Sequence, residues 1–247
     1  LSKIKNITII DRFSINRLNL NKYTHIINFS FDQNLKKKSI NFKNQLDEKI
    51  SRKIKDKGII YIMPSTRLVY SNLNKSIFKE TNKISKIDNI YGKNKRKIEL
   101  RLFNVLKRNV LILRISTILF FDKSSKDLFI SRVLRSLKKR DKVFFDIHMN
   151  TAKDFITIDK FSEALDKLIF ARKTGIFNIS SGFSIKIKSI IKKIIFGFGS
   201  GQTVYTTLKK SNSYCLDNKK LSKNIKFSIT KDHIFKYCVS LGKKLNA

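Results

Sequence analysis

The sequence predicts an α/β fold built on a parallel sheet, and three observations favour it. Short runs rich in Ile and Val alternate with longer segments whose apolar residues recur at helical spacing. The run 58–63 begins with Gly58 and is followed by Pro64, which is typical of a buried parallel strand. Ser65 and Thr66 then stand at the carboxyl end of that strand, where open α/β sheets keep their functional residues.

The first half of the chain is predicted to alternate strands and helices. Apolar, β-branched runs predict strands over residues 7–11, 24–29 and 58–63, with a short helix between the first two. Residues 36–54 are expected to form a longer helix closed by Gly58, because apolar side chains recur at steps of four: Phe42, Leu46, Ile50 and Ile54. This order of elements is the alternation that produces a parallel sheet.

The second half continues the pattern. A helix is predicted from Tyr91 to residue 107, with one buried face made of Ile98, Leu102, Val105 and Leu106. Strands are expected over residues 109–116, 143–147, 175–179, 204–207 and 214–216, and helices over residues 126–138, 161–170, 185–195 and 234–245. The Gly-rich stretch 197–201 follows a helical segment, so we expect a loop there rather than a phosphate-binding turn.

Tyr91 and Lys95 have a spacing with a definite chemical use. Residues four apart on a helix are neighbours, and a nearby ammonium is expected to favour the phenolate and lower the pKa of Tyr91. Such a pair can exchange a proton with a sugar or alcohol oxygen, which the hydroxyl of Thr66 can hold in place. The alternative is that Tyr-x-x-x-Lys arises by chance in a chain this rich in Lys.

The order of the motifs around this pair resembles the extended short-chain dehydrogenase/reductase family, which contains NAD-dependent epimerases, dehydratases and reductases of nucleotide sugars. Residues 64–70 are similar to the family's Ser/Thr cluster followed by Val-Tyr, and Glu80 is similar to an acid in the next loop. The further similar pieces are Tyr-Gly-x-x-Lys-x-x-x-Glu from Tyr91 to Glu99, the strand that carries Arg114, Lys-Asp-Phe-x-x-x-Asp over residues 153–159, and Phe-Asn-x-Ser-x-Gly over residues 177–182.

The resemblance implies a Rossmann-type doubly wound parallel sheet with a small C-terminal α+β substrate lobe. Residues 1–182 would form the domain that binds NAD(P), with residues 119–153 contributing to the substrate side, and residues 183–247 would form the lobe. The family's Gly-rich turn, which anchors the pyrophosphate, has no counterpart before Gly58. Because the sequence also begins with Leu1 rather than Met, we expect an N-terminally incomplete domain.

The resemblance also assigns roles to individual residues. The expected catalytic residues are Thr66, Tyr91 and Lys95; the expected cofactor-binding residues are Asp11, Asn28, Phe29, Ser30, Asn41, Ser65, Tyr91 and Lys95; and the expected substrate-binding residues are Thr66, Arg67, Lys153 and Asp154. Lys153 stands where the family has an Arg, so it supplies charge without the bidentate fork. Asp154 has a second interpretation, as the cap of a local turn, and Glu99 has one as an exposed helix partner of Lys95 or Arg96.

The implied activity is that of an epimerase or reductase that uses NAD or NADP and acts on a nucleotide sugar, in the cytoplasm and in bacterial cell-surface polysaccharide synthesis. The family's dehydratases carry Asp-Glu directly after the catalytic Thr, whereas Arg67 and Leu68 stand here, which argues against dehydration. A homodimer through residues 36–54 and 91–107 is a further implication. Epimerase and reductase remain equally open.

The net charge of +36 raises nucleic acid as a partner. The basic residues are spread along the chain without a binding motif, so a general bias toward Lys, Ile and Asn is the better explanation. The alternative function is therefore a non-catalytic relic of the fold or a basic nucleic-acid-binding protein. Cys215, Cys238 and the three His residues have no metal-ligand spacing, and no apolar run is long enough to span a membrane.

Overall fold

The computed structural model describes residues 7–11, 14–17, 19–30, 32–70, 76–84, 86–121, 129–145, 148, 150–205 and 212–246. The chain divides into two compact units. Unit 1 comprises Leu1–Asn74, Lys79–Ile115 and Glu163–Ile179, and unit 2 comprises Lys75–Phe78, Ser116–Ser162 and Ser180–Ala247. The predicted division at residue 182 concerns cofactor and substrate roles, and it stays a prediction.

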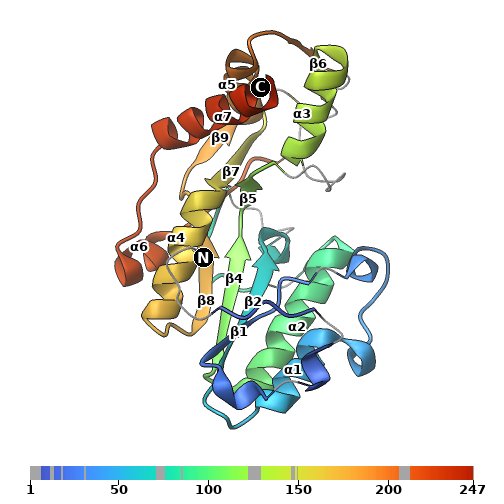
Figure 1. The fold of residues 1–247 in the computed structure, drawn as a ribbon, viewed down its shortest axis with the longest axis vertical. Helices are drawn as coiled ribbons and strands as arrows, with labels where there is room; N and C mark the ends of the chain where they lie inside the picture. Colours follow the sequence, from blue (N-terminus) through green and yellow to red (C-terminus); the bar gives the residue numbers. More distant parts are fainter. Residues whose placement is uncertain are drawn as a thin grey trace. The chain divides into compact units, whose positions relative to one another are not determined.

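Unit 1 is built on a four-stranded sheet in which every pairing is parallel. The strands, in spatial order, are β1 (His25–Ile27), β2 (Ile60–Thr66), β4 (Val110–Ile115) and β8 (Gly175–Ile179) (Figure 1). The central strands β2 and β4 are apolar along most of their length and almost fully buried. A sheet covered on both faces requires such continuous apolar strands, and the predicted parallel α/β sheet is confirmed.

Two helices cover one face of this sheet. α1 (Leu46–Ile54) packs against α2 (Ile90–Leu106), and α2 packs on β2 and β4 (Figure 1). Ile98, Leu102 and Leu106 point from α2 into a core that also contains Ile54 of α1 and Ile112 of β4. The predicted helix from Tyr91 and its buried face are therefore confirmed.

The N-terminal part of unit 1 differs from the prediction. Residues 7–11 form no strand, and the described part of the next segment contains the 3-10 turns η1 (Ser14–Arg17) and η2 (Leu20–Lys22). The expected helix over residues 36–54 is wrong in its first half, which contains η3 (Gln33–Lys36) and η4 (Phe42–Asn44) before α1 begins.

Side-chain caps explain this interruption. The side chain of Asn41 accepts a hydrogen bond from the amide of Lys43, and that of Gln45 accepts one from the amide of Glu48. Asn94, fully buried on α2, also accepts from the amide of Ile40 and donates to the carbonyls of Leu35 and Lys38. These backbone groups are therefore bonded to side chains and not to a helix, which apolar spacing alone does not predict.

The described residues of unit 2 form three small sheets. β5 (Thr117–Leu119) pairs parallel with β7 (Ala152–Thr157), which pairs antiparallel with β9 (Ser184–Lys186). The other two are parallel pairs: β6 (Lys142–Phe145) with β10 (Gln202–Tyr205), and β3 (Ile77–Phe78) with β11 (Cys215–Leu216). The helices are α3 (Phe129–Arg140), α5 (Ile187–Phe198), α6 (Lys219–Ile225) and α7 (Lys231–Asn246), while α4 (Ile158–Phe170) is divided between the units.

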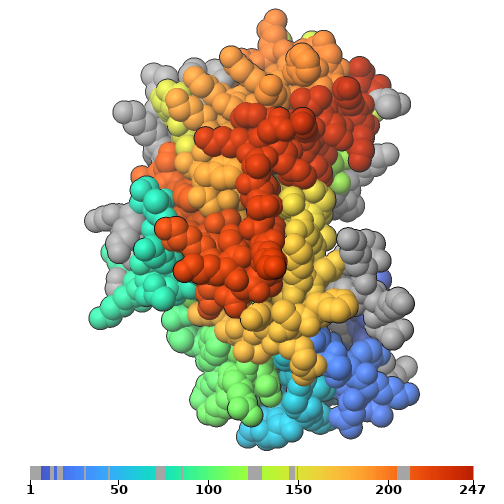
Figure 2. Space-filling model, turned by 90° about the vertical axis from the view of Figure 1, so that its left-hand side faces the viewer, coloured from blue at the N-terminus to red at the C-terminus, as the bar shows by residue number. Residues whose placement is uncertain are grey.

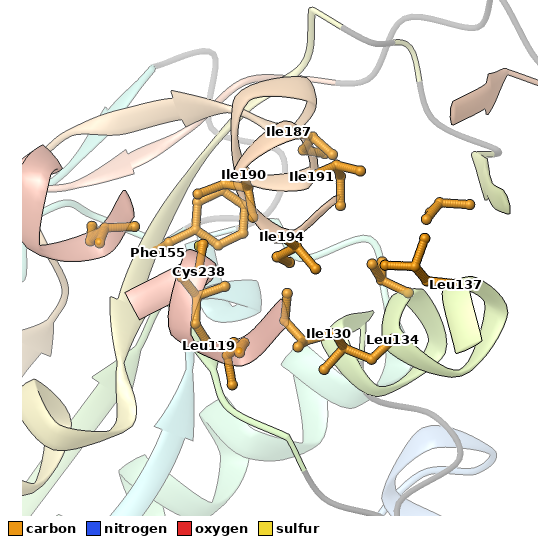
Figure 3. Packing of buried hydrophobic residues seen from close by; sticks show 14 of the residues in the cluster. Leu119, Ile130, Leu134, Leu137, Phe155, Ile187, Ile190, Ile191, Ile194 and Cys238 are labelled. Atoms are coloured by element: carbon orange, nitrogen blue, oxygen red, sulfur yellow. The ribbon is translucent and has the colours of Figure 1, made fainter. Parts of the chain in front are cut away.

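The core of unit 2 lies between its helices. Figure 3 shows Ile187, Ile190, Ile191 and Ile194 of α5 in one cluster with Ile130, Leu134 and Leu137 of α3 and Cys238 of α7. α5 and α7 approach each other so closely that a Cβ on Gly242 would lie 2.2 Å from the carbonyl oxygen of Ile194. The segment from α6 to α7 (red) forms a continuous strip on the surface of unit 2 (Figure 2).

Most predicted elements of unit 2 are present with shifted ends. The helix expected over residues 185–195 begins at Ile187, because residues 184–186 pair with β7 as β9. Parts of three predicted elements, residues 126–128, 146–147 and 206–207, lie outside the described residues. Among the helices of the described chain, none is long and apolar enough to cross a membrane.

Candidate functional site

Three polar side chains stand in one row at the carboxyl end of the unit 1 sheet. In the strand register, Ser65 of β2 is opposite Arg114 of β4, and Arg114 is opposite Asn178 of β8. All three are buried, with exposed fractions of 6%, 1% and 0%. Polar side chains are costly in such a position unless they are bonded to one another or to neighbouring elements.

The carboxylate of Glu99, on α2, accepts hydrogen bonds from two residues of this row, Ser65 and Arg114. It accepts from Nη2 and Nε of Arg114 at 2.7 Å and 3.1 Å, and from the hydroxyl of Ser65 at 2.6 Å. Arg96 adds a third cationic contact at 2.9 Å. Burial would lower the pKa of the Arg114 guanidinium, but its hydrogen bonds and its attraction to Glu99 raise it. The alternative interpretation of Glu99 as an exposed helix partner is right about Arg96, with which Glu99 forms an ion pair, and wrong about exposure: Glu99 is fully buried and also forms a bidentate ion pair with Arg114.

The network continues to the neighbouring strand. Arg114 donates to the hydroxyl of Tyr70 at 2.9 Å, and Tyr70 donates to the side-chain oxygen of Asn178 at 2.9 Å. Glu80 accepts from the amide of Asn178 at 2.8 Å, which ties the turn after β3 (Ile77–Phe78) to β8. Burial raises the pKa of Tyr70 to about 12, although the charge of Arg114 opposes this. Tyr70 is therefore a neutral link in a buried network.

Tyr91 and Lys95 lie in the first turns of α2, which begins after the N-cap Asn89. Lys95 is 9% exposed, and its ammonium donates to the carbonyl of Pro64 at 2.9 Å. The same ammonium is 5.9 Å from the centre of the Tyr91 ring. Because Pro64 precedes Ser65 and Thr66 in β2, this hydrogen bond anchors Lys95 at the candidate site's strand end.

The protonation of this pair differs from the prediction. Burial raises the pKa of Tyr91 to about 12, so the phenol is protonated near neutral pH. Burial also lowers the pKa of Lys95, against the charges of Asp47 and Glu99. The expectation that Lys95 lowers the pKa of Tyr91 is wrong for the free protein, in which burial raises that pKa.

Thr66 and the start of α2 are held together through Leu68. The hydroxyl of Thr66 accepts from the amide of Leu68 at 3.2 Å, which leaves the hydroxyl hydrogen of Thr66 available as a donor. The carbonyl of Leu68 lies where a Cβ on Gly92 would be only 2.4 Å away. Glycine at this position therefore allows the helix that carries Tyr91 to approach the strand end that carries Thr66.

The expected cofactor residues after β1 form a turn. Asn28 accepts from the amide and hydroxyl of Ser30 at 3.0 Å and 2.6 Å, and its amide donates to Asp47 at 2.8 Å. Phe29 is 52% exposed. The turn is therefore fixed from within, while Phe29 and Ser30 face outward.

The remaining expected cofactor residues have local partners. Asp11 accepts from the amide and hydroxyl of Ser14, and Asn41 caps η4. Ser65 donates its hydroxyl hydrogen to Glu99, so toward a cofactor it can only accept. Their roles in cofactor binding stay predictions.

The expected substrate residues lie in different units. Arg67 opens η5 (Arg67–Tyr70) in unit 1, whereas Lys153 and Asp154 belong to β7 in unit 2. Asp154 is fully buried; one oxygen accepts from the amide and hydroxyl of Ser181, each at 2.9 Å, and the other accepts from the amide of Leu216 at 3.1 Å. Burial raises its pKa to about 6, although these hydrogen bonds oppose this. Both oxygens are therefore engaged inside unit 2.

Sequence reasoning missed two buried polar residues that contact the expected site segments, Asp47 and Asn94. Asp47 is 5% exposed and accepts from Tyr61, Asn28 and Gln45. Asn94 holds residues 35–40 against α2, next to Lys95. The available signal for Asn94 was its place between Tyr91 and Lys95 on the buried side of the helix.

The architecture described above is the Rossmann-type fold of solved nucleotide-sugar epimerases and dehydratases. No family model matches the chain, and no curated protein sequence matches it. The likeness to solved structures is therefore one of fold, at low sequence identity.

Three solved structures illustrate this likeness. MoeE5 in complex with UDP-glucuronic acid and NAD has a TM-score of 0.74 and 17% identity, covering 93% of this chain and 82% of its own. UDP-glucuronic acid 4-epimerase from Bacillus cereus in complex with NAD has a TM-score of 0.73 and 18% identity, covering 96% and 80%. RMD from Pseudomonas aeruginosa complexed with NADPH has a TM-score of 0.62 and 16% identity, covering 76% and 67%.

Proposed function

We propose that the protein is an NAD- or NADP-dependent epimerase or reductase that acts on a nucleotide sugar. The observation that carries this proposal is the placement of Tyr91 and Lys95 one turn apart on α2, with Lys95 bonded to the carbonyl of Pro64 beside Thr66. The fold likeness to NAD- and NADPH-bound enzymes supports it. We also propose that the enzyme is cytoplasmic and serves bacterial cell-surface polysaccharide synthesis.

The strand ends of unit 1 carry residues that fit a nicotinamide cofactor. The carboxyl ends of β1 and β2 present a turn with outward-facing Phe29 and Ser30 and the buried ammonium of Lys95. Lys95 and Tyr91 would hold the ribose next to the nicotinamide, and Asp11, Asn28 and Asn41 would bind the rest of the cofactor. When bound, the cofactor supplies the hydride acceptor or donor of the reaction.

Two residues of the chain would act on the hydroxyl proton of the sugar: Thr66 would orient the reacting oxygen, and Tyr91 would exchange the proton with it. Thr66, oriented by the amide of Leu68, donates a hydrogen bond to the reacting sugar oxygen. Tyr91 exchanges a proton with that oxygen. Because its pKa is about 12 in the free protein, Tyr91 begins as a proton donor and needs added positive charge to act as a base. The ammonium of Lys95, 5.9 Å from the centre of the ring, is already present in the free protein and does not supply that addition by itself.

Substrate binding is assigned to Thr66, Arg67 and Lys153, with Asp154 in a supporting place within β7. A cationic Lys153 would attract a diphosphate without the bidentate contact that an Arg gives. Dehydration is excluded from the proposal because Arg67 and Leu68 follow Thr66. The possible direction, epimerisation or reduction, and the homodimer through α1 and α2 stay predictions.

Titration with NADH and NADPH, followed by nicotinamide fluorescence, tests the proposal. We expect saturable binding that weakens at least about tenfold in Lys95→Met, because the ribose contact and its charge are lost. Lys93→Met is the matched control, since Lys93 is exposed on the same helix. Turnover is then measured with a panel of UDP- and dTDP-sugars.

The alternative function gives a different outcome. A cofactor-free relic of the fold would show no fluorescence change with either nucleotide. A basic nucleic-acid-binding protein would instead bind duplex DNA with an affinity that falls steeply as salt rises. Either result, with no turnover of any sugar, would contradict the enzyme proposal.

A further inference from the structure

Residues 35–40, the docked segment, lie against α2 between the turns η3 and η4. Leu35 belongs to the core cluster of unit 1 and Ile40 packs against it, whereas residues 36–39 are exposed. A segment with few buried apolar contacts and an exposed backbone opens easily. The docked segment therefore needs a further interaction to keep one conformation on the helix.

The side-chain amide of Asn94 supplies that interaction. Its Oδ1 accepts from the amide of Ile40 at 3.0 Å, and its Nδ2 donates to the carbonyls of Leu35 at 2.9 Å and Lys38 at 2.7 Å. Asn94 is fully buried, and both hydrogens of its amide are used. The opposite orientation of the amide would place its oxygen against two carbonyls, so the pattern of partners fixes the orientation. A carboxylate or an apolar side chain of this size could not make the same set of bonds.

The place of Asn94 on α2 joins the docked segment to the candidate pair. Asn94 comes three residues after Tyr91 and directly before Lys95. The ring of Tyr91 packs against the same core cluster that contains Leu35, and Ile40 also packs against this cluster. The docked segment and the pair therefore share one turn of α2 and one core.

The docked segment leads directly into an expected cofactor residue. Asn41 follows Ile40 and is exposed, and its side-chain oxygen accepts from the amide of Lys43 at 3.0 Å. This cap leaves the NH2 group of the Asn41 side chain as the donor toward a cofactor. The backbone before Asn41 is fixed by Asn94, and the cap of η4 fixes its side chain.

We propose that Asn94 is a positioning residue that holds the docked segment on α2 and thereby fixes Asn41 relative to Tyr91 and Lys95. The cofactor part of this role rests on the proposed function. The docking is a property of the protein without any ligand, so it is measured separately.

The first test removes the amide and keeps the side-chain volume. Asn94→Leu loses all three hydrogen bonds, and Asn104→Leu makes the same chemical change at an exposed position of α2. Hydrogen exchange, resolved by peptide with mass spectrometry, reports the opening of each segment. In Asn94→Leu we expect exchange of the docked segment to rise at least about tenfold, while β2 and β4 change little. Asn104→Leu should match the wild type.

The second test measures the cofactor part by titration with NADH and NADPH. In the wild type, the nucleotide that binds should slow exchange of the docked segment, because binding and ordering of the segment are linked. Its dissociation constant should rise about tenfold in Asn94→Leu and stay unchanged in Asn104→Leu.

A double variant separates positioning from a general structural effect. If Asn94 acts through Asn41, adding Asn94→Leu to Asn41→Ala should weaken nucleotide binding no further than Asn41→Ala alone. A purely structural role of Asn94 would give losses that add.

The outcomes are distinct. Unchanged exchange of the docked segment in Asn94→Leu would overturn the docking role. Faster exchange with an unchanged dissociation constant, additive losses in the double variant, or no slowing of exchange by the bound nucleotide would overturn the positioning role. A wild type that binds neither nucleotide would contradict the proposed function and the cofactor part with it, and the exchange of Asn94→Leu would still decide the docking.

Discussion

Glu99 in unit 1 and Asp154 in unit 2 are both fully buried carboxylates, but their surroundings differ in kind. Glu99 is held by the guanidinium groups of Arg114 and Arg96 and by a serine hydroxyl. Asp154 is held by two backbone amides, a serine hydroxyl and the thiol of Cys215, all neutral, and burial raises its pKa to about 6. A cation permits a carboxylate to stay charged in the interior, whereas neutral donors only partly replace water.

The difference also concerns function. The Glu99 network joins β2, β4 and β8 at the strand ends beside Thr66 and Lys95, so it gives the candidate site a rigid charged support. Asp154 joins the chain around Ser181 to β11 and has no cation among the partners that the structure describes. The Glu99–Arg114 ion pair of unit 1 therefore supports the candidate site, whereas Asp154 of unit 2 links the segment around Ser181 to β11.

The largest expected effect comes from removing the cation. Arg114→Met should lower the free energy of unfolding by about 3–5 kcal/mol, because Glu99 is left buried with the partly exposed Arg96 as its remaining cation. Urea unfolding measures this, with the exposed Arg108→Met as the matched control. The double variant Glu99→Met with Arg114→Met should recover most of the loss. A loss in Arg114→Met no larger than in the control would refute the account of this pair.

The second effect concerns the pH dependence of unit 2. The pKa of Asp154 is raised on folding, so the folded state holds the proton more tightly than the unfolded state. Its contribution to stability is therefore complete below its unfolded pKa of 3.8 and is lost as pH rises through about 6. Over that window the wild type should lose about 2–3 kcal/mol relative to Asp154→Asn.

Urea unfolding of both proteins between about pH 4 and pH 7 gives this difference directly. Hydrogen exchange at β7 assigns it to unit 2. The stability difference between wild type and variant should shrink as pH rises. A difference that stays constant with pH would mean that Asp154 is charged throughout and that its neutral donors suffice.

The smallest expected effects come from removing the serine hydroxyls that donate to the two carboxylates, Ser65 to Glu99 and Ser181 to Asp154. Ser65→Ala should lower the free energy of unfolding by about 1 kcal/mol at any pH in this range, because Glu99 keeps its cations. Ser181→Ala should instead raise the pKa of Asp154 further and move the pH-dependent loss to higher pH. Equal pH dependence in the two variants would remove the distinction between the two carboxylates.

The sequence predicted the sheet and the main helices because their signals are local. The apolar run before Pro64, the buried face of the helix from Tyr91 and the strand at residues 175–179 all appear in the structure. The helix expected over residues 36–54 failed because Asn94, which is distant in sequence, bonds to the backbone of residues 35–40. Apolar periodicity carries no information about such a tertiary contact.

The sequence predicted which residues belong to the candidate site, but it did not predict their ion pairs or their pKa values. A clue to the Glu99 pair was present: Arg114 interrupts an apolar strand, and a buried Arg requires a buried acid. The pKa of Tyr91 could not be predicted from its spacing to Lys95, because the burial of the phenol in the folded protein raises it. Cofactor and substrate roles of the individual residues remain predictions.

A matched pair of tyrosine variants tests the central claim most directly. Tyr91 and Tyr70 lie in the same unit, and burial raises the pKa of each to about 12. Only Tyr91 stands one turn from Lys95. With the nucleotide sugar that gives turnover, Tyr91→Phe should abolish the reaction and leave binding and stability nearly intact, whereas Tyr70→Phe should lower stability and retain the reaction. Normal turnover in Tyr91→Phe would contradict the account.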